Sequence, residues 1–255
     1  MKQEGATGSN GAVIRFERIS KSFGGLRVLD DVSFEVRRGE AFCILGRSGT
    51  GKSVTLRHLV GLIKPDRGRI YVEDEEITAL DAQGLARVRK RIGFLFQYSA
   101  LFDSISAGEN VAFPLRRHTR RTEREIRERA RLLLESVGLS DVYDKMPAQI
   151  SGGMQKRVAL ARALALNPPI LLVDEPSSGL DPVTAGEIDE LLVGLKERDK
   201  TTMVVVTHNI PSARILGNEL ALLHEGRILA RGTPEQLEAS GHELVRAFLN
   251  FQGGN

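Results

Sequence analysis

Residues 46–53 read Gly46-Arg47-Ser48-Gly49-Thr50-Gly51-Lys52-Ser53 and match the pattern G-x-x-x-x-G-K-[ST] at every fixed position. The apolar run Ala41–Leu45 (AFCIL) comes directly before this stretch and is typical of a buried strand. After it, Leu56, Leu59 and Val60 recur at helical spacing, which predicts a helix over 53–62. A strand, a glycine-rich turn and a helix in this order are the context in which the pattern binds phosphate.

The residue types of this loop suit a nucleotide. Glycines let backbone N–H groups converge on phosphate oxygens without Cβ clashes, and the start of the helix adds partial positive charge. We expect Lys52 to reach the β and γ phosphates and the Ser53 hydroxyl to ligate Mg²⁺. The alternative is an ordinary glycine-rich loop, which the complete pattern in its proper context disfavours.

Two adjacent carboxylates, Asp174 and Glu175, follow an apolar strand expected at 170–173. Neighbouring side chains on a strand point in opposite directions, so the two acids need not share one task. We expect Asp174 to hold Mg²⁺, directly or through water, and Glu175 to accept the proton of an attacking water. The alternative is that the pair merely caps a turn before Pro176.

Strands and helices alternate along most of the chain. Further strands are expected at 13–16, 32–36, 69–73, 92–96 and 202–206, further helices at 122–137, 152–165 and 185–198, and a short hairpin around 225–226. This alternation predicts the α/β class, with a largely parallel sheet and helices on its faces. The mostly helical segment from about 97 to 164 interrupts the alternation and indicates an inserted helical subdomain.

Composition and charge limit the class of protein. Thirty-six Lys and Arg against 33 Asp and Glu leave a formal charge of +3, which is too small to indicate a nucleic-acid partner. The arginines of 116–131 are interleaved with glutamates, as on a solvated face.

The longest stretch without Asp, Glu, Lys or Arg is the 13 residues 201–213, whereas a bilayer span needs roughly 20 apolar residues. Cys43, the single cysteine, cannot form an intramolecular disulfide. Residues 1–11 lack the apolar core of a secretion signal and read as a flexible leader. We therefore expect a cytosolic protein without a nucleic-acid partner, which can still attach to a membrane partner.

A second candidate phosphate contact lies far along the chain. Ser151, Gly152 and Gly153 begin an expected helix 99 residues beyond Lys52, where backbone donors and a hydroxyl could meet phosphate. One nucleotide does not need two such cradles from one chain.

Six motifs occur in a fixed order. They are the phosphate loop, Gln97 after an apolar strand, Ser151-Gly152-Gly153, Asp174-Glu175, Ser178-Gly179-Leu180-Asp181, and His208 after a strand. In this order they resemble the motifs of ATP-binding cassette (ABC) ATPases, and the resemblance covers roughly residues 13–240.

The resemblance implies a fold and domain boundaries. The expected fold is a P-loop NTPase of RecA type, with a mostly parallel sheet, an inserted helical subdomain and a small antiparallel β part. After the leader at 1–11, the ABC ATPase domain would occupy 12–250. Within it, 12–96 and 166–232 would form the nucleotide-binding core and 97–165 the helical subdomain, while 233–255 would form a short C-terminal helix and tail.

The resemblance also implies roles for individual residues. Two ATP molecules with Mg²⁺ would lie between the subunits of a head-to-tail homodimer, each held by one subunit's phosphate loop and the partner's signature, residues 151–153. Gln97 would contact Mg²⁺ and the attacking water, His208 would contact the γ phosphate, and Asp181 would link the two sites. Phe23, 29 residues before Lys52, would stack on adenine, although a core phenylalanine is the alternative.

Other segments of the chain resemble one group within this family. The segments 94–97 (FLFQ), 100–102 (ALF), 110–116 (NVAFPLR), 118–119 and 248–250, with Met154 in the signature, look like the ATPase of phospholipid transporters of the Mla type (maintenance of lipid asymmetry). That group works with proteins of the mammalian-cell-entry class. The signature departs from the common Leu-Ser-Gly-Gly-Gln at Ile150 and Met154, and the tail after Asn250 is shorter than in some relatives.

The expected function is therefore ATP hydrolysis that powers transport of phospholipid or a similar hydrophobic molecule, on the cytoplasmic face of the inner membrane. A separate permease would dock near Tyr98, Leu101 and Phe102, apolar residues in a connection expected to lie at the surface. Two alternatives remain: an ABC ATPase for another substrate class, such as amino acids or ions, and a non-transport ABC ATPase.

Overall fold

A computed structural model describes residues 11–250 of the chain. The expected leader at 1–11 lies, apart from Gly11, outside the described residues, and so does the tail at 251–255. None of the helices in the described residues combines the length and the hydropathy that a bilayer span requires.

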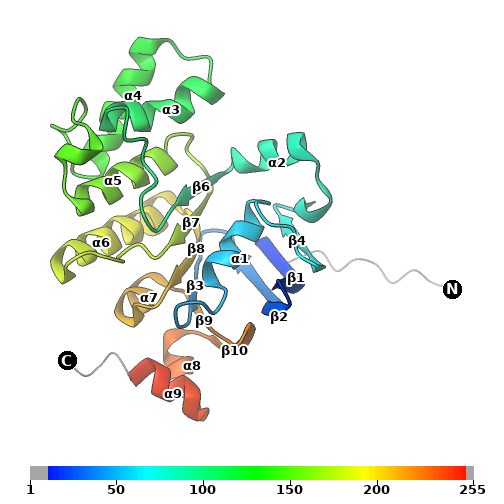
Figure 1. The fold of residues 1–255 in the computed structure, drawn as a ribbon. Coiled ribbons are helices and arrows are strands. Elements are labelled where there is room, and N and C mark those ends of the chain that lie inside the picture. Colours follow the sequence, from blue (N-terminus) through cyan, green and yellow to red (C-terminus); the bar gives the residue numbers. More distant parts are fainter. Residues whose placement is uncertain (1–10, 251–255) are drawn as a thin grey trace.

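A six-stranded sheet forms the centre of the molecule (Figure 1). Its strands, in spatial order, are β10 (Arg227–Gly232), β9 (Glu219–His224), β3 (Ala41–Leu45), β8 (Thr202–Thr207), β7 (Ile170–Asp174) and β6 (Ile92–Leu95). All neighbours from β9 to β6 are parallel, and only β10 runs antiparallel to β9. The predicted α/β class with a largely parallel sheet is confirmed.

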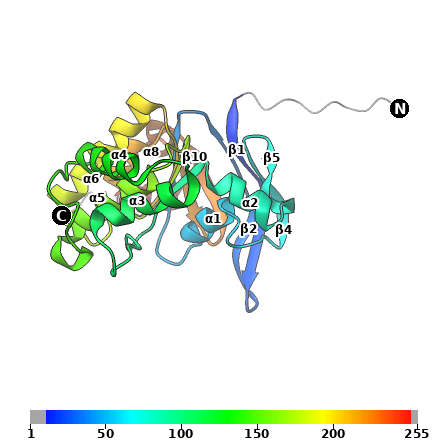
Figure 2. The same ribbon diagram turned by 90° about the horizontal axis from the view of Figure 1, so that it is seen from above.

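A second sheet is antiparallel and lies beside the first (Figures 1 and 2). Its order is β2 (Leu26–Arg37), β1 (Ala12–Phe23), β4 (Arg67–Val72) and β5 (Glu75–Glu76). Three buried rings tie the two sheets together, because Phe34 of β2 stacks on Phe16 of β1 and on Phe42 of β3, each at 4.8 Å between ring centroids. This is the expected antiparallel part of the fold.

Nine α-helices occur in the described residues. They are α1 (Lys52–Leu59), α2 (Ala82–Arg89), α3 (Ala107–His118), α4 (Glu123–Ser136), α5 (Gly152–Ala163), α6 (Pro182–Asp199), α7 (Ile210–Leu216), α8 (Pro234–Glu238) and α9 (Glu243–Asn250), with short 3₁₀ turns at Ile77–Ala79 and Pro147–Gln149. Helices α3, α4 and α5 fall between β6 and β7 in the chain, and both views place them away from the antiparallel sheet (Figures 1 and 2).

The central strands bury both faces in separate cores. Cys43, Leu45, Leu171 and Val173 pack on the side of α3–α7, whereas Phe42 and its alternate neighbours pack on the side of α1 and the antiparallel sheet. Burial on both faces explains why these strands read as continuous apolar runs.

Several expected boundaries were wrong by a few residues. The helix expected over 53–62 ends at Leu59, since Gly61 takes a φ of 63° that helical residues do not adopt. The helix expected from 185 begins at Pro182 instead, because Asp181 caps it by accepting from the Val183 and Thr184 amides and proline suits the first helical position. Two helices, α8 and α9, occupy the region where one was expected.

A buried carboxyl joins α6 to α7. Oδ2 of Asp189 accepts a 2.6 Å hydrogen bond from Ser212 Oγ, and within the described residues Oδ1 has no partner. Burial raises the pKa of the Asp189 carboxyl, and the bond from Ser212 opposes this rise only in part. A carboxyl with a raised pKa keeps its proton in the folded state at pH values where the unfolded chain has lost it. The free energy of unfolding therefore falls as pH rises through that window.

We expect Asp189→Asn to remove this pH dependence, because an amide has nearly the shape of the carboxyl and does not ionise. As pH rises from about 4 toward 8, the melting temperature of the wild type should fall relative to that of the variant, on the order of 2–4 °C for each kcal/mol. Thermal unfolding across this range measures the effect, with the exposed Asp199→Asn on the same helix as control. A difference that does not change with pH would contradict the raised pKa.

Candidate functional site

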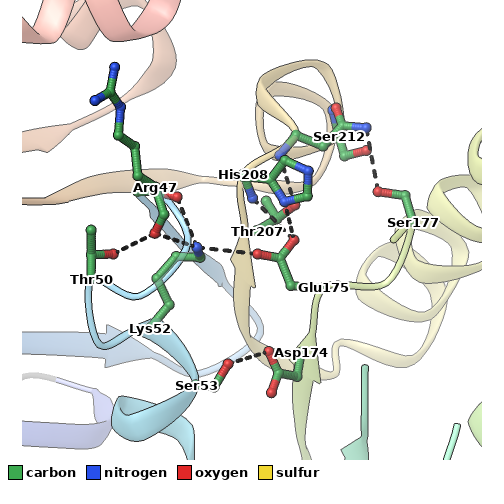
Figure 3. A network of polar contacts seen from close by, with 12 residues as sticks. Arg47, Thr50, Lys52, Ser53, Asp174, Glu175, Ser177, Thr207, His208 and Ser212 are labelled. Atoms are coloured by element: carbon green, nitrogen blue, oxygen red, sulfur yellow. Dashed lines mark hydrogen bonds and ion pairs between the residues drawn. The ribbon is translucent and has the colours of Figure 1, made fainter. Parts of the chain in front are cut away.

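The candidate site lies where three neighbouring parallel strands end. In the sheet, Leu45 of β3 pairs with Thr207 of β8, and Asp174 of β7 pairs with Val206 of β8. Because the strands are parallel, the residues that follow them meet at one edge of the sheet. The phosphate loop is thus brought together with Asp174-Glu175 and His208, which follow it by more than 120 residues in the chain (Figure 3).

Glycines fix the course of the loop at residues 46–51. Gly51 takes a φ of 101° at the start of α1, and a Cβ there would lie 2.9 Å from the Val28 carbonyl oxygen. At Gly46 a Cβ would lie 2.6 Å from the carbonyl oxygen of Leu223. The loop therefore takes a path that only glycine permits at both ends.

The Lys52 side chain is turned into its own loop. Its ammonium donates to the carbonyl oxygens of Gly46 at 2.8 Å and Arg47 at 3.1 Å, and it forms an ion pair with Glu175 Oε1 at 3.3 Å (Figure 3). Only 6% of Lys52 is exposed. An ammonium group that lies within a glycine-rich loop, together with the backbone amides of that loop, can bind a phosphate group.

Ser53 and Asp174 offer a site for a divalent cation. Ser53 Oγ donates to Asp174 Oδ1 at 2.9 Å at the floor of the loop. Burial raises the pKa of the Asp174 carboxyl, and the Ser53 hydrogen bond counteracts this. Within residues 11–250 no cluster of three or more His, Cys, Asp or Glu side chains could hold a metal alone. A hydroxyl and one carboxylate fit Mg²⁺, which typically takes one or two carboxylates together with substrate phosphates.

Glu175 is held in a strained turn at the end of β7. Its φ is 47°, and its amide donates to the Val206 carbonyl oxygen at 2.9 Å. Its carboxylate Oε2 accepts from His208 Nδ1 at 2.8 Å and from the His208 amide at 3.2 Å (Figure 3). A left-handed backbone at a non-glycine residue costs of order 1–3 kcal/mol and typically marks functional sites. Here it turns Glu175 toward Lys52 and His208 while Asp174 faces Ser53.

Lys52, Ser53, Glu175 and His208 border a cavity of about 750 Å³, whereas Asp174 does not line it. Its polar wall includes Lys52, Gln97, Glu175 and His208. An apolar wall, which the sequence patterns did not suggest, comes from Leu222 and Leu229 of the β9–β10 hairpin and from Leu244 and Phe248 of α9. The volume is sufficient for a nucleotide-sized ligand.

Two groups of expected binding residues lie apart from this cavity. Phe23, at the end of β1, is 45% exposed and does not line it; the Lys21 ammonium lies 5.4 Å from the centre of its ring. This exposure disagrees with the alternative of a core phenylalanine. Ser151 and the two glycines after it also do not line it: Ser151 caps α5 by accepting from the Met154 amide at 3.2 Å, and Gly153 abuts Thr184.

The connection after Gln97 is apolar and only partly exposed. Tyr98 is 86% exposed, and Phe102 contacts Phe113 of α3 with 4.9 Å between the ring centroids, both rings being nearly half-exposed. Leu101, in contrast, is half-buried and packs against the main core. The exposed apolar surface at this place therefore consists of Tyr98, Phe102 and Phe113 rather than Leu101.

Three polar residues that support the site were missed by sequence reasoning. Asn110, Lys156 and Arg162 reach the backbone that follows Gln97, and Asn110 and Lys156 are buried. Asn110 opens the segment 110–116 noted in the sequence, but neither that match nor a polar residue in a helix that packs on the core reveals a hydrogen-bond partner.

The chain is similar to known transport ATPases. The model of the family described as "ABC transporter" matches residues 29–178. The probable ribonucleotide transport ATP-binding protein mkl of Mycobacterium leprae is 42% identical over 240 residues, which cover 94% of this chain and 69% of that protein. The intermembrane phospholipid transport system ATP-binding protein MlaF of Escherichia coli K12 is 38% identical over 232 residues, which cover 91% and 86%. A solved dimeric ATP-binding cassette in a post-hydrolysis state with ADP and Pi superposes with a TM-score of 0.81 at 37% identity, covering 86% of this chain and 98% of that one.

We expect Lys52→Ala to weaken the binding of nucleoside triphosphate by roughly 10- to 100-fold, since a hydrogen bond to a charged group contributes about 1.5–3 kcal/mol. Equilibrium binding of a fluorescent ATP analogue measures the change. The exposed Lys64→Ala, which lies outside the cavity, should bind as the wild type does. Unchanged affinity in Lys52→Ala would show that the loop is not the phosphate site.

Proposed function

The chain belongs to the ABC transporter family, as the ATP-binding and ATP-hydrolysing subunit of such a transporter, and from this premise we propose that it powers phospholipid movement through a separate membrane permease. The observation that carries the assignment of the catalytic residues is the meeting of Lys52, Glu175 and His208 at one end of the cavity.

Lys52 exchanges partners when ATP binds. Its ammonium leaves the loop carbonyls and Glu175 for the β and γ phosphates, around which the amides of Gly46, Arg47, Ser48, Gly49, Thr50, Gly51, Lys52 and Ser53 converge. Ser53 and Asp174 would hold Mg²⁺, with Gln97 in contact with it, and the bound ion would supply positive charge to the phosphate oxygens. Glu175 Oε1 is then free to accept the proton of the attacking water.

His208 orients the base and contacts the γ phosphate. Its ring and its amide both donate to Glu175 Oε2 in this structure, which leaves the other carboxylate oxygen to face the water. With 53% of its side chain exposed, His208 has room to turn toward a phosphate at the open end of the cavity. Positioning of this kind accounts for most catalysis of phosphoryl transfer.

A second copy of the chain completes each site. Ser151, Gly152 and Gly153 do not reach the cavity of their own subunit, which supports a role in trans at the nucleotide of a partner. In such a head-to-tail homodimer Asp181, which caps α6 and accepts from the Thr184 hydroxyl beside Gly153, lies between the two sites. Phe23 does not line the cavity of this structure, and its stacking on adenine is proposed because nearly half of the residue is exposed.

The substrate and the partners are proposed from the likeness to the MlaF relative. The name of the MlaF relative and the motif match around 94–119 support phospholipid as the transported molecule. The permease docks on Tyr98 and Phe102, with Leu101 beneath them, and a protein of the mammalian-cell-entry class presents the lipid. The ATPase then sits on the cytoplasmic face of the inner membrane. The mkl relative, named for ribonucleotide transport, supports a different substrate as the second candidate.

We expect Glu175→Gln to bind ATP while its hydrolysis falls by about 10²–10⁴-fold, because the amide keeps the shape and loses the basicity of a general base. With ATP the variant should elute as a dimer, whereas Ser151→Arg in the same background should stay monomeric and still bind ATP. ATPase assays and size-exclusion chromatography measure both effects, with the exposed Glu190→Gln as control. Near-normal turnover would remove Glu175 from the role of base, and loss of monomer binding in Ser151→Arg would contradict the trans arrangement.

We expect Phe102→Glu to leave the isolated subunit folded and able to bind ATP, but to prevent copurification with the permease, because a carboxylate would replace an aromatic contact. Ile215→Glu, at another exposed apolar residue, on α7, is the matched control. Mass spectrometry of lipids extracted from the wild-type complex should find enriched phospholipid. A ribonucleotide or an amino acid in its place would contradict the lipid assignment, and normal assembly of Phe102→Glu would move the docking site elsewhere.

A further inference from the structure

A buried lysine outside the known motifs contacts the backbone of Gln97. Lys156 lies on α5, is 3% exposed, and donates from its ammonium to the Gln97 carbonyl oxygen. Burial lowers the pKa of Lys156, while the nearby carboxylates of Asp174 and Glu175 oppose this. A buried ammonium costs stability that an apolar side chain of similar length would not cost. Packing alone therefore gives no reason for a lysine at this position.

A second contact from the same helix holds the next turn of the backbone. Arg162 donates to the carbonyl oxygens of Ser99 at 2.7 Å and Ala100 at 2.6 Å. Ser99 and Ala100 have φ values of 61° and 48°, in the left-handed region that non-glycine residues rarely adopt. These two hydrogen bonds offset the unfavourable backbone conformation, so this turn depends on α5 for its shape.

Helix α3 holds the remainder of the segment 97–106, which we call the glutamine loop. Asn110 is fully buried, and its side chain accepts from the Phe102 amide at 2.8 Å. Its amide group donates to the carbonyl oxygens of Phe102, Ile105 and Ser106 at 3.0–3.3 Å. All of these side-chain hydrogen bonds join the glutamine loop to α3 and α5, and none of them joins it to the central sheet.

The same helix α5 begins with the signature. Ser151 caps its first turn, and Lys156 follows five residues later, about 7.5 Å along the helix axis. Gln97 meanwhile lines the same cavity as Glu175 and His208. Helix α5 thus carries Ser151, which is proposed to contact the partner's nucleotide. Through Lys156 the same helix also fixes the backbone of Gln97, which is proposed to act at the subunit's own nucleotide.

We propose that Lys156 is a positioning residue that makes the glutamine loop move together with α5, so that docking of the signature on the partner's ATP sets Gln97 at the subunit's own ATP. The proposal rests on the function proposed above and specifies how its two sites are linked. Each site reaches its active geometry when the other is filled, which makes ATP hydrolysis by the dimer cooperative.

Lys156→Met tests the link, because it removes the donor and keeps an unbranched apolar stem. In the nucleotide-free protein, amide hydrogen exchange of residues 98–102 should rise by about tenfold as the loop loses its tie to α5. The same change at the exposed Lys145, Lys145→Met, should leave this exchange as in the wild type. Unchanged exchange in Lys156→Met would overturn the proposal, whether or not the protein hydrolyses ATP.

Kinetics separate positioning from a general structural effect. Lys156→Met should lower kcat by about tenfold, as expected for a lost hydrogen bond to a charged group, with a Hill coefficient near one and unchanged ATP binding by the monomer. In a Gln97→Ala background the same substitution should lower kcat no further, and Lys156→Arg, which retains a donor, should recover part of the wild-type rate. An equal loss of kcat in both backgrounds would overturn the positioning role. Absence of ATP hydrolysis in the wild type would instead contradict the function proposed above.

Discussion

The parallel pairing of β3, β8 and β7 is the constraint on which the rest of the site depends. It places the ends of three strands side by side, so that a cation from one connection, two carboxylates from the next and an imidazole from the third occupy one small volume. Both faces of these strands are buried, so a shift in their register would expose apolar side chains and also separate the groups proposed as catalytic. The stability of the core and the geometry of the site therefore depend on the same backbone hydrogen bonds.

Features that follow from local pattern could be predicted from the sequence. The strands β3 and β7 are short apolar runs, and the motif residues Lys52, Ser53, Asp174, Glu175 and His208 do meet in one place. Features set by tertiary packing were not predictable. Strand β1 extends well past the expected 13–16 because irregular pairing with β2 accommodates its polar residues. Helix α3 contains Pro114, which argues against a helix, but its buried face against α4 and α5 outweighs that local preference.

The side chains that hold the glutamine loop in place could not be predicted from the sequence either. Lysine and arginine on a helix are usually at the surface, and nothing in the spacing of Lys156 and Arg162 reveals that both reach backbone carbonyls more than 55 residues away. Buried polar side chains of this kind satisfy backbone groups of irregular segments. Where a loop lacks secondary structure of its own, its shape is determined by residues that are distant in sequence and become visible only in the folded chain.

The ion pair between Lys52 and Glu175 also affects how strongly the protein retains nucleotide. Glu175 Oε1 is paired with the Lys52 ammonium in this structure, so this carboxylate competes with a phosphate group for the same cation. Under the roles proposed above, the competition lowers the apparent affinity for ATP and, after hydrolysis, the affinity for ADP and phosphate. With Glu175 as the proposed base and Lys52 as the proposed phosphate ligand, their re-pairing after hydrolysis shortens the lifetime of the product complex and favours turnover over tight binding.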